Sequence, residues 1–119
     1  MHKEPIEYLH HILDECRFIL MTTKDISKND LLENETLKRA IVRSLEVIGE
    51  ASKKITVDFK LKWNGINWKN MAGMRDRLIH DYMGINYTIV WDVVRNKIPE
   101  LSQQISEVIC EESLGQKDK

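Results

Sequence analysis

Apolar residues recur at intervals of three and four over most of this chain, which is the spacing of one face of an α-helix. The pattern is clearest over residues 35–55 and again over residues 90–108. Only five glycines and two prolines occur among the 119 residues, which favours long helices over a turn-rich β architecture. The sequence therefore predicts an all-α fold, an antiparallel bundle of four to five helices.

Local signals place the ends of the predicted helices in the first half of the chain. Pro5 suits the first turn of a helix, because the amide hydrogen that proline lacks would have no partner there. The helical period is lost over residues 56–65, which we interpret as a loop. The helices expected before this loop span residues 5–22, a short turn within residues 27–34, and residues 35–55.

Two further helices are expected in the second half of the chain. Asn67 suits the N-cap of a helix over residues 68–83, and Gly84 suits its C-terminal stop. Asn86 then caps a last helix, which Pro99 should kink because proline removes one of its hydrogen bonds.

The composition is that of one small helical domain. With 119 residues, 42% hydrophobic and 31% charged, the chain can bury a single core and is too apolar to be disordered. We predict one domain over residues 5–110, followed by a polar, frayed tail over residues 111–119.

Composition and charge also exclude several classes of protein. No run approaches the roughly 20 apolar residues of a membrane span, and no apolar signal region follows the first five residues. Cys16 and Cys110 fit neither a disulfide framework nor a zinc site. A net charge of −1 argues against a general nucleic-acid coat but allows a small basic cleft. We expect a cytoplasmic protein without metal or cofactor.

The segment Arg75-Asp76-Arg77-Leu78-Ile79-His80, followed by Asp81-Tyr82, gathers the side chains best suited to chemistry. Metal-free cleavage of a phosphodiester needs a cation to hold the phosphate and an imidazole to move protons. On the predicted helix Arg75 falls within the apolar sector, and His80 lies about 140° away toward the polar side. Asp76 precedes His80 by one turn and could hold the tautomer of its imidazole.

Each of these residues also has a purely structural interpretation. Arg75 could form a buried ion pair with Glu46 or Glu50, because an unpaired buried charge is strongly destabilising. His80 could be a solvent-exposed histidine, and Tyr82 a core tyrosine whose hydroxyl reaches the rim. The residues alone leave these alternatives open.

Other candidate residues carry weaker signals. His10 and His11 are adjacent and point to different faces of a helix, which disfavours a shared metal site. Trp63, Trp68 and Trp91 could stack on bases, but packing in the core or at an interface is the favoured interpretation. Glycine-rich phosphate loops, zinc-ligand spacings and serine-elbow motifs are absent from the sequence.

The pattern Arg75-Asp76-x-x-x-His80-x-Tyr82 on the third long helix of a small bundle resembles the HEPN superfamily (higher eukaryotes and prokaryotes nucleotide-binding domains). It is most similar to the HepT-like toxin branch, whose motif is an arginine, four to six residues, a histidine and then x-Tyr. The segments that carry the similarity cover most of residues 5–110: Arg39-Ala40-Ile41, Ile48-Gly49-Glu50-Ala51, Trp68 through Gly84, Val90-Trp91 and Ile98-Pro99.

The resemblance implies a metal-independent endoribonuclease toxin that acts as a homodimer, with its two motif helices facing each other across a cleft. In that case Arg75 binds the scissile phosphate, His80 acts as general acid or base, and Asp76 orients one of the two. The implied substrate is RNA, with tRNA as the family-level expectation.

The resemblance also implies a partner, a minimal nucleotidyltransferase antitoxin that attaches AMP to the motif tyrosine, here Tyr82. An added phosphate beside Arg75 would occupy the anion site and repel RNA. Two alternatives stay open at this point. One is a non-catalytic dimeric module that binds a nucleotide or a nucleotidyltransferase, and the other is a purely structural bundle.

Overall fold

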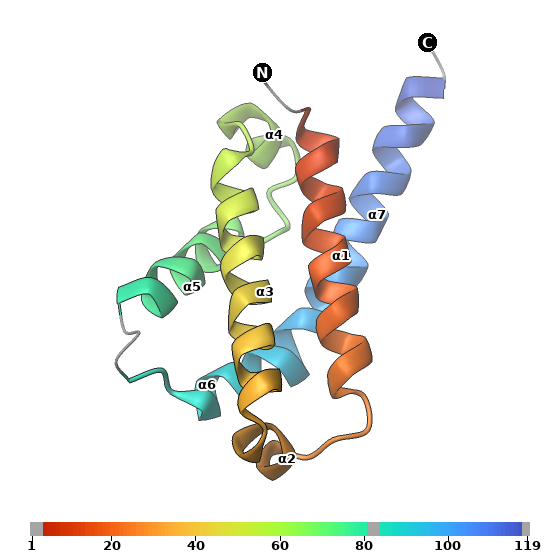
Figure 1. The fold of residues 1–119 in the computed structure, drawn as a ribbon. Helices are drawn as coiled ribbons and strands as arrows, with labels where there is room; N and C mark the ends of the chain where they lie inside the picture. Colours follow the sequence, from red (N-terminus) through yellow and green to blue (C-terminus); the bar gives the residue numbers. More distant parts are fainter. Residues whose placement is uncertain (1–3, 81–83, 118–119) are drawn as a thin grey trace.

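The computed structural model is an all-α bundle, as the sequence predicts (Figure 1). It describes residues 4–80 and 84–117, apart from the side chains of residues 75, 78–80 and 116–117. The long helices in these ranges are α1 (Pro5–Thr23), α3 (Glu35–Lys54), α5 (Trp68–His80) and α7 (Ile98–Lys117). The shorter elements are α2 (Lys28–Glu33), α4 (Val57–Lys62), α6 (Tyr87–Asp92) and the π-helix η1 (Val93–Lys97).

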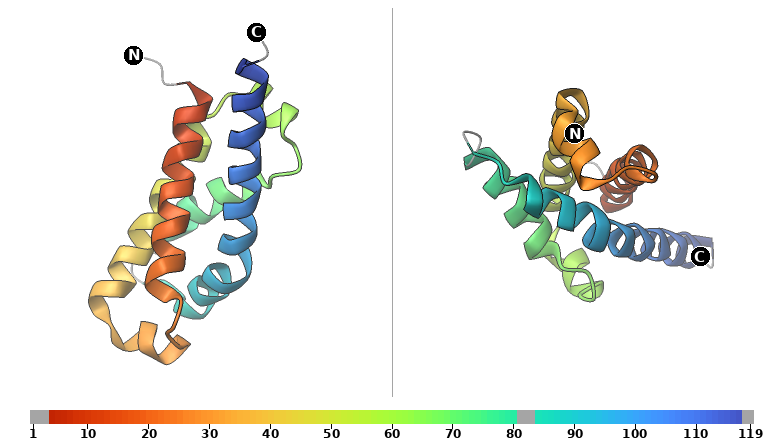
Figure 2. Two further views of the ribbon diagram at one scale, coloured as in Figure 1. Left: turned by 90° about the vertical axis from the view of Figure 1, so that its right-hand side faces the viewer. Right: turned by 90° about the horizontal axis from the view of Figure 1, so that it is seen from below.

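The core lies where α1 packs between α3 and α7, while α5 crosses the other side of α3 (Figures 1 and 2). Leu9 and Ile12 of α1, Ile41 of α3 and Ile105 of α7 are all 0% exposed. Burying each such side chain stabilises the fold by about 1.5–3 kcal/mol. No helix in the described part of the chain is long and apolar enough to cross a membrane.

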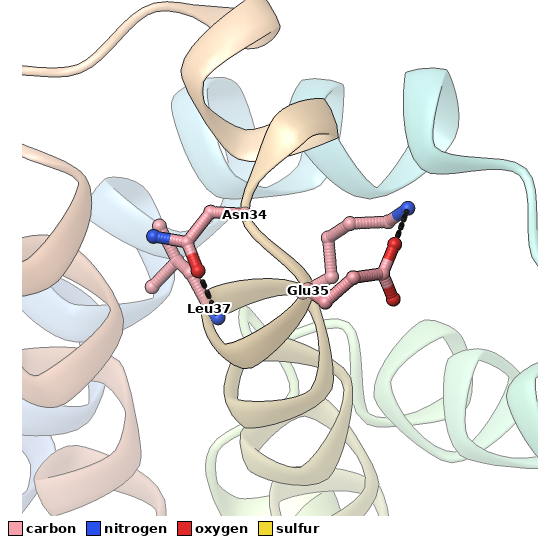
Figure 3. Close-up of polar contacts among 4 residues, drawn as sticks. Asn34, Glu35 and Leu37 are labelled. Atoms are coloured by element: carbon pink, nitrogen blue, oxygen red, sulfur yellow. Dashed lines mark hydrogen bonds and ion pairs between the residues drawn. The ribbon is translucent and has the colours of Figure 1, made fainter.

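The junction between α2 and α3 is fixed by one side chain (Figure 3). The Asn34 N–H donates to the carbonyl of Leu31 (3.1 Å) and closes α2, while its Oδ1 accepts from the Leu37 N–H (3.0 Å) and opens α3. Beside it, Glu35 pairs with Lys38 at 3.1 Å. The expected short turn within residues 27–34 and the long helix beginning at residue 35 are both confirmed.

The loop expected over residues 56–65 is wrong in its centre, where α4 forms. Thr56 caps this helix, its Oγ1 accepting from the Phe59 N–H at 3.3 Å. Six residues make fewer than two turns, too few to show a helical period in the sequence. Two of its apolar side chains, Val57 and Leu61, are also exposed, by 70% and 66%. The burial pattern that reveals the longer helices is therefore missing here.

The last predicted helix is present from Tyr87, but it is interrupted before Pro99. Residues 93–97 form η1, and the Ile98 N–H donates to the carbonyl of Val93, five residues back. Because proline has no N–H and crowds the preceding turn, the ordinary ladder cannot continue unchanged through this point. The chain changes direction between α6 and α7 as the kink prediction requires (Figure 1).

The end of the chain also differs from expectation. α7 continues through Lys117, so residues 111–117, expected to be frayed, are helical. Glu112 gives this extension a partner, because its carboxylate accepts from Trp63 Nε1 (2.7 Å) and pairs with Lys62 Nζ (2.8 Å). These contacts tie α7 to the C-terminal end of α4, through Lys62 and through Trp63, which directly follows α4 and precedes Glu112 by 49 residues.

Candidate active site

The helix that carries the motif, α5, is fixed at its N-terminal end. Asn67 is its N-cap as predicted, and its Oδ1 accepts from the Asn70 N–H at 3.0 Å. Trp68, the first residue of α5, is 7% exposed and donates from Nε1 to the carbonyl of Trp63 at 3.1 Å. The motif therefore begins only two turns from a side chain anchored in the core.

The structure places Arg75, Asp76 and His80 on α5, as the sequence predicts. Helix geometry separates the Arg75 and His80 positions by about 7.5 Å along the axis and about 140° around it. The side chains of Arg75 and His80, and all of Tyr82, lie outside the described part of the structure. Their convergence on one substrate stays a prediction. Glu46, one of the two carboxylates considered for Arg75, pairs with Arg43 at 3.4 Å.

Asp76 has a partner that sequence reasoning did not find. Its carboxylate forms an ion pair with the ammonium of Lys53, in the last turn of α3. The side chains of Asp76 and Lys53 are 45% and 37% exposed, so the pair lies at the rim of the α3–α5 contact. In the sequence Lys53 is one of many lysines on the polar face of its helix, and nothing marks it as a neighbour of the motif.

A groove of about 710 Å³ lies beside the motif helix, between α5 and the α6–η1–α7 segment. Its apolar lining includes Leu45 and Ile48 of α3, Met71 and Met74 of α5, and Leu101 of α7. Its polar lining consists of Asn67, Lys69, Asn70, Arg77, Asp92, Lys97, Glu100 and Gln104. The groove thus combines an apolar floor with amide, cationic and anionic groups.

The wall that α5 contributes to this groove is an open face of the helix. Lys69, Gly73 and Arg77 follow one another at intervals of four residues, and all three are exposed. A Cβ built on Gly73 would meet no atom within 4 Å, so nothing in the described fold requires glycine there. Neither Lys69 nor Arg77 has an ion-pair partner among the described residues. His80 follows Gly73 by two turns, which places its position on this same side of α5.

The tryptophans and cysteines considered as candidates lie in different environments. Trp68 is buried, and Trp91 lies half-buried with its ring 4.4 Å from the Arg95 guanidinium carbon. Cys16 and Cys110 are both free thiols. Burial, with a smaller contribution from the nearby charge of Glu15, raises the pKa of the Cys16 thiol to about 12. A thiol so held in its neutral form is a core residue and no nucleophile.

Comparisons with known proteins point to one family. A family model described as Ribonuclease HepT-like matches residues 12–108. A Caldanaerobacter subterraneus protein, provisionally named an RNase, is 47% identical over 110 residues, which are 92% of this chain and 98% of that protein. A Methanocaldococcus jannaschii protein, also provisionally named an RNase, is 43% identical over 90% of this chain and 88% of its own length.

A third relative links the chain to HepT by name. This Thermococcus cleftensis protein, provisionally named ribonuclease HepT, is 41% identical over 80% of this chain and 86% of its own length. No solved structure matches the chain significantly. The family match spans most of the chain and contains the whole of α5. The chain therefore belongs to the HepT-like ribonuclease family of the HEPN superfamily.

Proposed function

We propose that this protein is a metal-independent endoribonuclease whose site is built from Arg75, Asp76 and His80. The observation that carries the proposal is the family match over residues 12–108, which includes α5 with all three motif positions. The ion pair of Asp76 with Lys53 and the open groove face of α5 support it, because the pair holds α5 in place and the groove lies on the side of α5 that carries the His80 position.

The proposed reaction needs only groups of the protein and the RNA. His80 removes the proton of a ribose 2′-hydroxyl, the 2′-oxygen attacks the adjacent phosphorus, and the bond from phosphorus to the 5′-oxygen breaks. The departing 5′-oxygen takes up a proton from an imidazolium, leaving a 2′,3′-cyclic phosphate on one fragment and a 5′-hydroxyl on the other. Arg75 stabilises the added negative charge on the phosphate oxygens.

We further propose that two copies of the chain complete each site. One α5 helix separates the Arg75 and His80 positions by about 140° around its axis, so the two residues of a single helix do not face the same phosphate. A homodimer with two facing α5 helices brings an arginine and a histidine from opposite sides. The RNA strand beside the scissile bond then lies along the open face of α5, with its phosphates near Lys69 and Arg77.

Regulation and context complete the proposal. The protein acts in the cytoplasm as a toxin on RNA, with tRNA as a candidate substrate, and a minimal nucleotidyltransferase is its antitoxin. That partner transfers AMP to Tyr82, and the added phosphate blocks the anion site. Co-expression with a nucleotidyltransferase should add mass in multiples of AMP to the wild type and to Tyr87→Phe, but not to Tyr82→Phe. Modification at another residue, or none, would contradict this antitoxin mechanism.

The nuclease proposal is tested with total RNA in EDTA. Wild type, Arg75→Ala and His80→Ala are compared with Arg43→Ala and His10→Ala, which remove exposed residues outside the motif. We expect both motif variants to lose at least about 100-fold in cleavage rate, and both controls to retain the wild-type rate. Cleavage that persists in either motif variant would refute the assigned roles.

The second candidate function is a non-catalytic dimeric module that binds a nucleotide or a nucleotidyltransferase. The net charge of −1 favours it, because RNA-binding proteins usually carry a basic excess. If the wild type is as inert toward RNA as the two motif variants and still binds nucleotide, this alternative replaces the nuclease.

A further inference from the structure

The ion pair between Lys53 and Asp76 joins α3 to α5 through two residues that are 23 apart in the sequence. Lys53 lies in the last turn of α3, where the carbonyl end of the helix dipole favours a cation. Asp76 lies in the C-terminal half of α5, directly after Arg75 and one turn before His80. The ion pair therefore holds α5 at the turn that carries the motif residues.

The apolar contact between α3 and α5 holds the two helices together, and a polar pair can in addition restrain the rotation of α5 about its axis. Leu45, Ile48 and Met71 belong to the buried core, and Met74 packs against it. Because such apolar contacts are not directional, a polar pair adds a directional restraint on the rotation of α5 about its axis. A rotation of about 20° would move a side-chain atom 5–6 Å from the axis by roughly 2 Å. In enzymes a misplacement of about 1 Å can lower the rate a hundredfold.

We infer that Lys53 is a positioning residue of the RNA-cleaving site, acting through its ion pair with Asp76. It holds α5 at the rotation that presents Arg75 and His80, and it directs the Asp76 carboxylate toward α3. The inference rests on the proposed function, but it adds a residue from a different helix. Lys53 itself contacts neither the substrate nor the reacting atoms in this account.

The exposure of the pair separates a positioning role from a stabilising one. With side chains 37% and 45% exposed, the two charges stay partly solvated, and such pairs contribute little to folding. Removing the ammonium should thus shift the melting temperature by no more than a few degrees. A large loss of kcat in a Lys53 variant whose melting temperature is nearly unchanged would indicate a positioning role.

The test compares Lys53→Met, Lys53→Arg, Asp76→Asn and the double variant Lys53→Met/Asp76→Asn on one RNA oligonucleotide in EDTA. Lys54→Met is the matched control, because Lys54 is the next residue of α3 and has no ion-pair partner among the described residues. We expect Lys53→Met to lose about tenfold in kcat with KM unchanged. Lys53→Arg should retain most of the activity, and Lys54→Met all of it.

The double variant shows whether Lys53 acts through Asp76. If it does, the double variant loses no more kcat than Asp76→Asn alone, since the two losses are not additive. Wild-type kcat in Lys53→Met would overturn the inference and leave the nuclease intact. A raised KM at unchanged kcat would also overturn it, because Lys53 would then bind RNA directly. A wild type that cleaves no RNA would refute the proposed function, and the inference with it.

Discussion

Replacing Trp68 should loosen the whole motif helix, because this side chain anchors the first residue of α5. The indole is 7% exposed, and its Nε1 donates to the carbonyl of Trp63 at 3.1 Å. Truncation of a buried tryptophan to alanine costs about 3–5 kcal/mol, a large part of the roughly 5–15 kcal/mol that stabilises a small domain. For a chain of this size, we expect the Trp68→Ala melting temperature to fall by roughly 10–25 °C.

A milder variant separates the packing from the hydrogen bond. Trp68→Phe keeps an aromatic ring in the core but removes the hydrogen bond to the Trp63 carbonyl, which still accepts from the Ile66 N–H at 3.2 Å. The loss of this one bond should cost about 0.5–1.5 kcal/mol. Trp91→Phe is the control, since Trp91 is only half-buried, and we expect it to lose less than about 1 kcal/mol. Urea and thermal unfolding followed by circular dichroism measure all three. A loss below about 1 kcal/mol in Trp68→Ala, with an unchanged urea slope, would refute the anchoring role.

Three further predictions concern a cap, the thiols and the groove. Asn34→Ala should lower the free energy of unfolding by about 1 kcal/mol in urea titrations, and Asn34→Asp should not; equal stability of all three proteins would contradict the cap. Cys110 should react with a thiol reagent in the folded protein, whereas Cys16 should react only on unfolding. Burial first, and then the Glu15 charge, raise the pKa of the Cys16 thiol from 9.0 to about 12. The contribution of this neutral thiol to the free energy of unfolding is therefore fully present below pH 9 and is lost as pH rises toward 12. A free energy of unfolding as high at pH 10.5 as at pH 8 would contradict this. Arg77→Ala should raise KM for RNA several-fold at unchanged kcat; an unchanged KM would exclude the groove as the RNA path.

Much of the fold was predictable because its long helices are amphipathic and capped by local residues. The predicted spans 5–22 and 35–55 agree with Pro5–Thr23 and Glu35–Lys54 to within one residue. Asn67 could be recognised as an N-cap from its own side chain and the pattern that follows it. Such signals are encoded within a few residues of the feature that they predict, so one sequence is enough to see them.

The errors arose where structure depends on distant residues or on short elements. α4 has too few residues to show a period, and its position is secured by Glu112, far along the chain. Pro99 predicts an interruption, but the π-helix that accommodates it begins six residues earlier, at Val93. A helical tail through Lys117 was not expected because residues 111–119 are mostly polar.

The candidate site was predictable only as a set of positions on one helix. The motif spacing gives the register of Arg75, Asp76 and His80, and the structure confirms that α5 carries them. The partner of Asp76 could not be predicted, since pairing with Lys53 depends on how α5 is rotated against α3. The same holds for the groove, whose lining comes from α3, α5, α6, η1 and α7 together.

Cleavage of a matched pair of RNA oligonucleotides in EDTA tests the central claim most directly. The two differ only at the cleaved position, where one carries ribose and the other 2′-deoxyribose. We predict that the wild type cuts only the ribose form, leaving a 2′,3′-cyclic phosphate and a 5′-hydroxyl, and that His80→Ala cuts neither. Equal cutting of both oligonucleotides, or cutting that requires an added divalent metal, would contradict metal-free attack by the 2′-oxygen.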